Sequence, residues 1–285
     1  MSVIMKGSEV AASMKEELLS EIEKLGQHGI VPGLGIVRVG TRPDDLAYEH
    51  GAVKKLEGMG IRCRVFDFPE TISQADFEKG FSSVNDDPTI HGILLFRPLP
   101  KHLDEEAVKR IINPLKDVDC MSPVNIAKVF SGDETGFAPC TPEAVMEVLA
   151  HYGIDLQGKR VTVMGRSMVV GKPLSMLLLK KNATVTICHT KTKNLVETCS
   201  NAEIIIAAAG KAKVVTHYLV AENAMVVDVG INVDDEGKLC GDVDYDSVAP
   251  KASYITPVPG GVGTVTSSVL AKHVVRAAGC LNGIR

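Results

Sequence analysis

The pattern of apolar and polar residues along the chain alternates between two periods. Some segments repeat apolar residues every three or four positions, as amphipathic helices do, and others carry short apolar or alternating runs, as strands do. The segments with helical spacing are residues 10–25, 44–59, 74–84, 104–112, 142–152, 172–179, 195–199 and 266–278. The strand-like segments are residues 33–39, 61–68, 91–96, 160–164, 183–187, 203–209, 224–229 and 254–255. This exchange of strands and helices predicts an α/β protein built on parallel sheets with helices on both faces.

Local signals predict where two of these helices begin. Ser73 is a candidate N-cap for the helix from Gln74, because its hydroxyl can accept a backbone N–H of the first turn. Thr141 followed by Pro142 predicts a second N-cap with proline at the first helical position. Residues 113–141 lack a clear period and contain several prolines and glycines, so we expect an active-site loop that also crosses between domains.

Composition and charge narrow the class of protein. The 285 residues suit one large or two ordinary domains, and 45% hydrophobic with 23% charged residues is typical of a soluble globular chain. A net charge of −4 gives no electrostatic case for binding nucleic acid or an anionic membrane, and the apolar runs are too short to span a bilayer. Seven cysteines without a C-x-x-C pair, and no secretory signal, favour a reduced cytoplasmic protein. No spacing among cysteine and histidine predicts a metal site.

A glycine-containing turn follows the strand at residues 160–164. Its sequence is Gly165-Arg-Ser-Met-Val-Val-Gly171, and Lys172-Pro173 begins the next helix. Strand, glycine turn and helix aim backbone N–H groups at a phosphate, so the turn predicts a Rossmann-like dinucleotide site. Ser167 stands where such turns usually have their second glycine, and an ordinary strand–helix turn is the alternative.

The end of the next strand bears on the choice of dinucleotide. NAD sites usually carry Asp or Glu there to hold the ribose 2′-hydroxyl, whereas this strand runs into His189-Thr-Lys-Thr-Lys193. A hydroxyl and two lysines, with Arg166 in the turn opposite, suit a 2′-phosphate. The sequence therefore favours NADP, with NAD possible and a solvated lysine loop as the alternative.

Motifs along nearly the whole chain resemble the methylenetetrahydrofolate dehydrogenase/cyclohydrolase family. They are residues 116–119 (Lys-Asp-Val-Asp), 139–142 (Pro-Cys-Thr-Pro), 165–173, 183–189, 227–232 (Val-Asp-Val-Gly-Ile-Asn), 241–244 (Gly-Asp-Val-Asp) and 256–263 (Thr-Pro-Val-Pro-Gly-Gly-Val-Gly). The resemblance implies two domains around a cleft. We expect a Rossmann-like NADP-binding domain at residues 140–265, and an α/β folate-binding catalytic domain at residues 1–139 with 266–285.

The family's activity and assembly are then expectations for this chain. Members oxidise 5,10-methylenetetrahydrofolate to the methenyl cation with NADP, and water then opens the cation to 10-formyltetrahydrofolate. The resemblance also implies a homodimer in the cytoplasm, with a small-molecule folate as substrate.

Site residues follow from the same resemblance, position by position. Tyr48 matches the active-site tyrosine that packs on folate, and Asp119 matches the carboxylate that holds the pterin edge. The expected folate contacts are Tyr48, Phe96, Pro98, Leu99, Asp119, Pro259, Gly260, Gly261 and Val262. The expected cofactor contacts are Gly165, Arg166, Ser167, Gly171, Lys172, Pro173, His189, Thr190, Ala209, Gly210 and Ile231.

The departures from the family pattern lie in the folate half. Ala52 stands where the family has the lysine that handles the proton of the cyclohydrolase step, and Phe96 replaces a glutamine. Lys55 shares a helix face with that position and is the candidate substitute, and Arg97 is a new cation. Hydride transfer needs positioning, whereas attack by water also needs proton handling. We therefore predict a retained dehydrogenase and a weak or absent cyclohydrolase.

Three alternatives stay open at this point. The chain can be fully bifunctional through Lys55 or Arg97, or it can be a non-catalytic folate- or dinucleotide-binding protein. A two-domain NADP dehydrogenase of the shikimate type is the third, although the glycine-rich motif at 256–263 argues against it.

Overall fold

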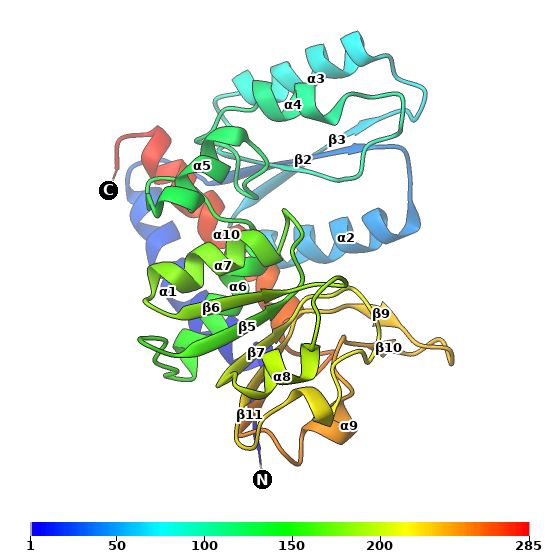
Figure 1. Ribbon diagram of the computed structural model, residues 1–285. Coiled ribbons are helices and arrows are strands. Elements are labelled where there is room, and N and C mark those ends of the chain that lie inside the picture. Colours follow the sequence, from blue (N-terminus) through cyan, green and yellow to red (C-terminus); the bar gives the residue numbers. More distant parts are fainter. Residues whose placement is uncertain (1, 285) are drawn as a thin grey trace. The chain divides into compact units, whose positions relative to one another are not determined.

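The computed structural model describes residues 2–284, which divide into two compact units. One unit contains the residues up to Ser13 together with Thr141–Thr266, and the other contains Met14–Cys140 together with the residues from Ser267 onward. Two helices, α1 (Gly7–Gln27) and α10 (Val262–Leu281), contribute residues to both units (Figure 1).

The unit that includes Thr141–Thr266 is built on a six-stranded sheet in the order β1-β11-β8-β7-β5-β6. In that order the strands are Val3–Ile4, Tyr254–Ile255, Met225–Asp228, Ile204–Ala207, Arg160–Met164 and Thr184–Cys188. All neighbouring pairs are parallel. The other elements of this unit are α6 (Cys140–His151), α7 (Gly171–Lys180), α8 (Leu195–Ser200), η1 (His217–Leu219), α9 (Tyr245–Val248) and the hairpin β9 (Asn232–Val233) with β10 (Leu239–Cys240).

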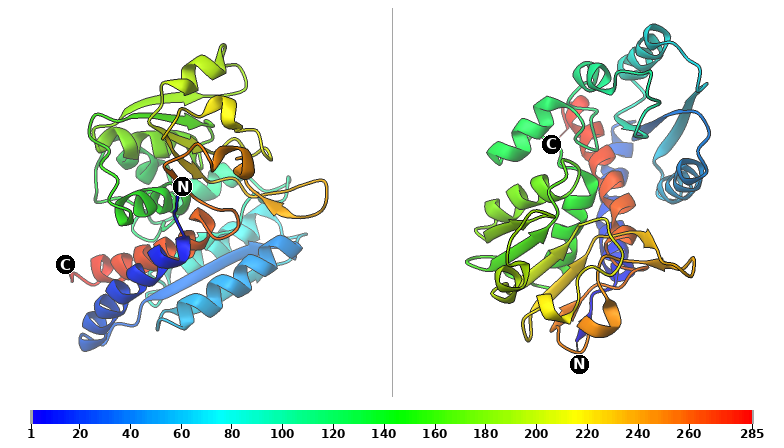
Figure 2. Two further views of the ribbon diagram at one scale, coloured as in Figure 1. Left: turned by 90° about the horizontal axis from the view of Figure 1, so that it is seen from below. Right: turned by 45° about the vertical axis from the view of Figure 1, so that its right-hand side comes forward.

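The central strands of this sheet are apolar on both faces. Every residue of β7 is buried, and β5 is buried from Val161 onward. Because helices cover both faces of a parallel sheet, its inner strands read as unbroken apolar runs instead of alternating ones (Figure 2). The parallel pairing of β1 with β11 explains why residues 2–13 lie in this unit, whereas they were expected in the folate-binding domain.

The other unit has a three-stranded parallel sheet in the order β3-β2-β4. Its elements are β2 (Gly33–Val39), α2 (Pro43–Glu57), β3 (Arg62–Phe68), α3 (Gln74–Asp86), β4 (Gly92–Leu95), α4 (Glu105–Ile111) and α5 (Pro123–Ser131). One sheet face presents Val37, Val39 and Ile93 to a core that includes Phe77 and Phe81 of α3. In Figure 1, α3 and α4 lie on one side of this sheet and α2 on the other.

The structure corrects three expected elements. Residues 113–141 are not one loop, because α5 lies within them, with Ser122 as N-cap and Gly132 as a left-handed C-cap. Helix α6 begins at Cys140, so Thr141 is not its N-cap and Pro142 is not its first residue. Helix α10 begins at Val262, four residues before the expected start. By contrast, β2, β5, β11 and the N-cap at Ser73 are confirmed.

Among residues 2–284, no helix combines the length and the apolar character needed to cross a membrane. Within the same part of the chain, no three His, Cys, Asp or Glu side chains are grouped so that they could hold a metal ion.

Candidate functional site

Tyr48 and Phe96 form an aromatic pair in the three-stranded unit. Tyr48 lies in α2 and Phe96 follows the last residue of β4. Their ring centroids are 5.8 Å apart in an edge-to-face arrangement, a favourable geometry for aromatic rings. Phe96 is buried, whereas Tyr48 is 44% exposed. The pair therefore offers a partly open aromatic surface of the kind on which a flat ring system can pack.

One turn of α2 beyond Tyr48 there is no amine. Ala52 occupies that position and is buried, and residues four apart lie on the same helix face. Lys55 lies on this face nearly two turns from Tyr48, where its ammonium donates a hydrogen bond to the Ser267 hydroxyl in α10 at 2.8 Å. Burial lowers the pKa of Lys55 below its ordinary value. The nearest candidate for proton handling is thus displaced along the helix and tied to Ser267.

Asp119 is held by a backbone donor and a guanidinium. The N–H of Cys140 donates to Asp119 Oδ1 at 2.9 Å, and Arg97 Nη2 lies 3.6 Å from Asp119 Oδ2. Arg97 also approaches Glu105, with 3.9 Å between Nη1 and Oε1. Burial acts to raise the pKa of Glu105, but bonds to Lys109 and the nearby cations outweigh it and leave the pKa lowered. Arg97 therefore lies between two carboxylates, one of which is the expected pterin-binding residue.

Cys120 follows Asp119 in a left-handed conformation, with φ of 56°. Glycine is the usual residue for this conformation, which matches the glycine that the family pattern has here. The thiol is buried, and burial raises its pKa far above the ordinary cysteine value. Because the thiolate is the reactive form, the buried thiol favours Cys120 as a packed neighbour of Asp119 over a nucleophile.

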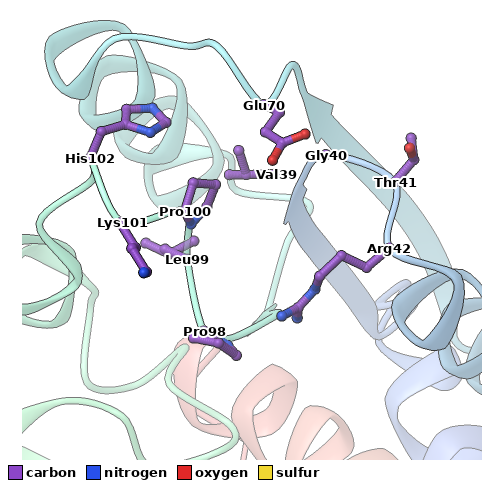
Figure 3. A pocket seen from close by; sticks show the side chains of 10 residues that line it. All are labelled: Val39, Gly40, Thr41, Arg42, Glu70, Pro98, Leu99, Pro100, Lys101 and His102. Atoms are coloured by element: carbon purple, nitrogen blue, oxygen red, sulfur yellow. The ribbon is translucent and has the colours of Figure 1, made fainter.

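A pocket of about 580 Å³ opens where β2 and the loop after β4 end. It is lined by Val39, Gly40, Thr41, Arg42, Glu70, Pro98, Leu99, Pro100, Lys101 and His102. Figure 3 shows the Arg42 side chain extending toward the loop at Pro98, where its Nη2 donates to the carbonyl oxygen of Arg97 at 3.3 Å. Pro98 and Leu99, two of the expected folate contacts, thus line a pocket at the carboxyl ends of parallel strands, where ligands of α/β proteins usually bind.

The glycine-rich segment before α10 belongs to the six-stranded unit. The carbonyl oxygen of Gly260 accepts the N–H of Gly7 at 2.8 Å, and Gly260 has φ of 100°. A Cβ on Gly261 would overlap with the carbonyl oxygen of Pro257. Pro259 and Gly260 are exposed, and Val262 is buried as the first residue of α10. The positive φ explains the glycine at 260, and close backbone approach explains the glycine at 261.

The turn between β5 and α7 fits a bound dinucleotide phosphate. Gly165 has φ of 137°, which other residues rarely adopt, and a Cβ on Gly171 would overlap with the backbone of Gly165 and Arg166. The Ser167 hydroxyl accepts the N–H of Val170 at 3.0 Å, which fixes the turn. Arg166 and Lys172 are exposed, whereas Pro173 is buried in the first turn of α7. The result is an exposed backbone turn next to a helix start, with a cation on each side.

The loop after β6 lies beside this turn. Strands β5 and β6 pair in parallel, with Met164 opposite Cys188, and the N–H of Gly165 donates to the carbonyl oxygen of Cys188. The His189 N–H donates to the Thr192 hydroxyl at 2.9 Å, and Thr190 is exposed. Both lysines of the loop are exposed as well. Cationic and hydroxyl groups therefore follow two neighbouring strand ends.

Three further expected cofactor residues lie on two other loops of the same unit. Ala209 and Gly210 follow β7, and Ile231 follows β8. All three are exposed, and Ile231 is 67% exposed. Because β5, β7 and β8 are neighbours in the sheet, these loops extend the same edge that carries the turn at Gly165.

Sequence reasoning missed the contacts between distant segments. Ser267 gave no signal as the partner of Lys55, because the two residues are 212 positions apart. Asp117 also had no expected role, yet its buried carboxylate accepts the N–H groups of Met121 and Ser122 and shapes the chain after Asp119. The Lys-Asp-Val-Asp motif was the available signal for Asp117.

Comparisons with known proteins agree with this arrangement. The family model described as tetrahydrofolate dehydrogenase/cyclohydrolase, catalytic domain, matches residues 5–119, and the model of the NAD(P)-binding domain of the same family matches residues 139–281. The bifunctional protein FolD of Clostridioides difficile is 58% identical over 274 residues, which cover 96% of each chain.

Solved structures give the same result. The crystal structure of the bifunctional enzyme FolD from Campylobacter jejuni has a TM-score of 0.95 and 40% identity, covering 98% of this chain and 99% of that chain. The Trypanosoma brucei methylenetetrahydrofolate dehydrogenase-cyclohydrolase, complexed with NADP and an inhibitor, has a TM-score of 0.91 and 34% identity, with 97% of each chain covered. With both family models matched in order along the chain, the protein belongs to the tetrahydrofolate dehydrogenase/cyclohydrolase family of enzymes.

Proposed function

We propose that the protein is an NADP-dependent 5,10-methylenetetrahydrofolate dehydrogenase whose cyclohydrolase step is weak or lost. The observation that carries this proposal is the buried Ala52, one turn along α2 from Tyr48. Hydride transfer leaves the substrate as the methenyl cation and requires no side chain to gain or lose a proton. Hydrolysis of that cation requires a group that accepts a proton from the attacking water.

The substrate side of the proposal rests on two groups with complementary chemistry. The Tyr48–Phe96 pair supplies an aromatic surface for a flat ring, and Asp119 supplies a carboxylate for two N–H donors. Arg97 Nη2, 3.6 Å from Asp119 Oδ2, helps to orient this carboxylate. Pro98 and Leu99, which line the pocket at the ends of β2 and β4, are further proposed folate contacts. The proposal also includes residues 259–262, of which Pro259 and Gly260 are exposed.

The cofactor side rests on the turn at Gly165 and the loop after β6. NADP supplies the acceptor for the hydride when it is bound. Arg166, Thr190 and the two lysines of the loop are the groups proposed to hold its 2′-phosphate. The loop has no carboxylate at the position that NAD sites use for the ribose hydroxyl.

The test is to follow two products at once. Purified protein is mixed with methylenetetrahydrofolate and NADP, and both NADPH and methenyltetrahydrofolate are recorded. The proposal expects methenyltetrahydrofolate to accumulate in step with NADPH and to decay at its spontaneous rate. Low methenyltetrahydrofolate beside rising NADPH would contradict the loss of cyclohydrolase, and no NADPH would contradict the dehydrogenase.

Full bifunctionality is the second candidate, favoured by one observation. Burial lowers the pKa of Lys55, which makes the neutral amine more accessible as a base. In that case Lys55→Met abolishes methenyl hydrolysis and leaves NADPH formation intact, whereas under the main proposal the variant behaves like the wild type. Ser267→Ala, which frees the amine from its hydroxyl partner, serves as the control.

We also propose that the protein is a cytoplasmic homodimer. The hairpin of β9 and β10 presents the apolar side chains of Val233, 65% exposed, and Leu239, 42% exposed. A second copy of the chain is the proposed partner for this apolar surface, and light scattering of wild type and Val233→Glu tests it. A loss of dimer in the variant supports the proposal, and a monomeric wild type contradicts it. The seven free cysteines suit a reducing compartment.

A further inference from the structure

Asp242 is a fully buried carboxylate that accepts four hydrogen bonds. Its Oδ2 accepts the N–H groups of Ala209 at 2.6 Å and Gly210 at 2.9 Å. Its Oδ1 accepts the N–H of Lys211 and the side-chain amide of Asn232, both at 2.9 Å. The relative exposure of Asp242 is 0%. Every one of these contacts uses a carboxylate oxygen as the acceptor.

The four donors come from two different loops. The N–H groups belong to the segment after β7, and Asn232 begins β9, just after the loop that follows β8. Strands β7 and β8 are parallel neighbours, so both segments lie at the same edge of the sheet. Asp242 itself follows β10, about 10 residues beyond Asn232. One side chain therefore ties together the two loops, in addition to the backbone bond from the Val229 N–H to the Ala207 carbonyl oxygen at 2.9 Å.

These loops are next to the phosphate turn. A Cβ on Gly165 would overlap with the carbonyl oxygen of Ala208, which shows how closely the turn and the segment after β7 pack. A shift of the segment at Ala209 and Gly210 would therefore press on the turn or leave a gap beside it. The position of the segment at Ala209 and Gly210 therefore depends on Asp242.

A second carboxylate, that of Asp228, in turn fixes the backbone at Asp242. Asp228 Oδ1 accepts the N–H groups of Gly230 and Asp242, and its Oδ2 accepts the N–H of Val243. A Cβ on Gly230 would overlap with the Asp242 carboxylate, and one on Gly241 would overlap with that of Asp228. The backbone and side chain of Asp242 thus have very little freedom to move.

Three successive N–H groups that point to one spot form an anion-binding nest. In this protein the nest of Ala209, Gly210 and Lys211 is filled by the chain's own carboxylate. Its three N–H groups are bonded to Asp242, so they are not available to a dinucleotide phosphate. Through its bonds to Asp242, the nest holds the loop in place and does not serve as a phosphate site.

From this geometry we propose that Asp242 is a positioning residue for dinucleotide binding, because it sets the spacing of the loops after β7 and β8 against the turn at Gly165. The inference rests on the proposed NADP site and names the residue that fixes the segment at Ala209 and Gly210. Asp242 touches no reacting atom, and its effect passes through Ala209 and Gly210.

The test compares Asp242→Asn with the wild type by fluorescence titration with NADPH. An amide can accept on one side only, so the two N–H groups on the other side lose their partner. We expect the Kd for NADPH to rise about 10- to 100-fold, as follows from losing bonds to a charged acceptor. The KM for methylenetetrahydrofolate should stay unchanged, and hydrogen exchange at residues 209–211 should become faster.

Asp234→Asn is the matched control. Asp234 also accepts two backbone N–H groups, those of Glu236 and Lys238, in the turn of the hairpin. It binds the segment after β7 through the Lys213 ammonium at 3.2 Å and not through the N–H groups of residues 209–211. It should bind NADPH as the wild type does. If Asp242→Asn fails to fold, Asn232→Ala replaces it, since this variant removes one donor and keeps the carboxylate, and its Kd should rise about threefold or more.

The outcomes distinguish a failure of the positioning role from a failure of the proposed cofactor. NADPH binding by Asp242→Asn or Asn232→Ala that equals the wild type overturns the positioning role. A wild type that binds no NADPH overturns the proposed cofactor and the inference with it. Weaker NADPH binding with an unchanged folate KM, beside a normal Asp234→Asn, supports the role, because general loss of stability would not select one ligand.

Discussion

At the scale of single residues, the folate half is defined by substitutions that remove a proton-handling group and add a fixed cation. Ala52 has no ionisable group, and Arg97 adds a guanidinium. Arg97 lies between Glu105 and Asp119, so its charge is already compensated. These residues favour holding a substrate in place over exchanging protons with it.

Ala52→Lys should restore hydrolysis of the methenyl cation. The new amine would lie one turn from Tyr48, on the face that Ala52 now occupies, and a positioned general base typically contributes about 100-fold or more. The rate at which methenyltetrahydrofolate decays at fixed pH measures the restored hydrolysis. Ala52→Met adds similar bulk at this buried position without an amine, so equal rates in the two variants would show that proton handling is not what the site lacks.

Asp119→Asn should weaken folate binding and spare the cofactor. The amide cannot accept two N–H donors as the carboxylate does, so the KM for methylenetetrahydrofolate should rise about 10- to 100-fold. NADPH titration should give the wild-type Kd. The exposed Asp67→Asn is the control, since its carboxylate has only a 3.7 Å contact with Arg38. A larger effect on NADPH than on folate would be incompatible with the proposed role.

At the scale of elements, the turn between β5 and α7 is the feature that tolerates least change. Gly171→Ala would place a Cβ on the backbone of Gly165 and Arg166, and backbone cannot yield as a side chain does. We expect the free energy of unfolding to fall by about 2 kcal/mol or more, together with weaker NADPH binding. Urea denaturation and NADPH titration measure both effects.

Gly26→Ala is the matched control for that prediction. Gly26 lies inside α1 with nothing within 4 Å of its added Cβ, so alanine should stabilise the helix by about 0.5–1 kcal/mol. If both variants shift stability in the same direction, the contact with the turn is not what makes Gly171 necessary.

The elements also show what the sequence can and cannot predict. Strands β2 and β5 follow from their apolar runs, because burial on both faces leaves little other choice. Helix α5 was missed although Ser122 and Pro123 give the usual start signal, because nearby prolines and glycines suggested a loop. The short hairpin of β9 and β10 leaves no period to detect. The bonds of Ser267 and Asp242 join distant segments, which no local pattern encodes.

At the scale of the whole molecule, the candidate binding residues occupy the same kind of position in both units. In each unit the candidate groups follow the carboxyl ends of parallel strands: the loops after β2 and β4 in one, and those after β5, β6, β7 and β8 in the other. Strand ends at this edge expose backbone and side chains on a rigid support. The requirement to bury apolar sheets on both faces therefore also decides where ligands can be held.

Asp228 gives this arrangement a pH dependence that can be measured on the whole chain. Burial raises its pKa to about 6, against the partial opposition of three backbone N–H groups and with help from the Asp242 charge. The ordinary pKa of an aspartate carboxyl, which applies to the unfolded chain, is 3.8. Between these values the folded protein binds a proton that the unfolded chain does not, so this residue's contribution to stability increases as pH falls from 7 to 4 and decreases as pH rises.

The prediction compares wild type with Asp228→Asn by urea denaturation across this range, so that all other titrating groups cancel. At pH 7 the variant should be less stable by about 2 kcal/mol or more, because its amide N–H₂ faces backbone N–H donors. The difference in unfolding free energy between wild type and variant should grow by up to about 3 kcal/mol toward pH 4. A constant difference would mean that the Asp228 carboxyl keeps an ordinary pKa, and that its hydrogen bonds outweigh its burial.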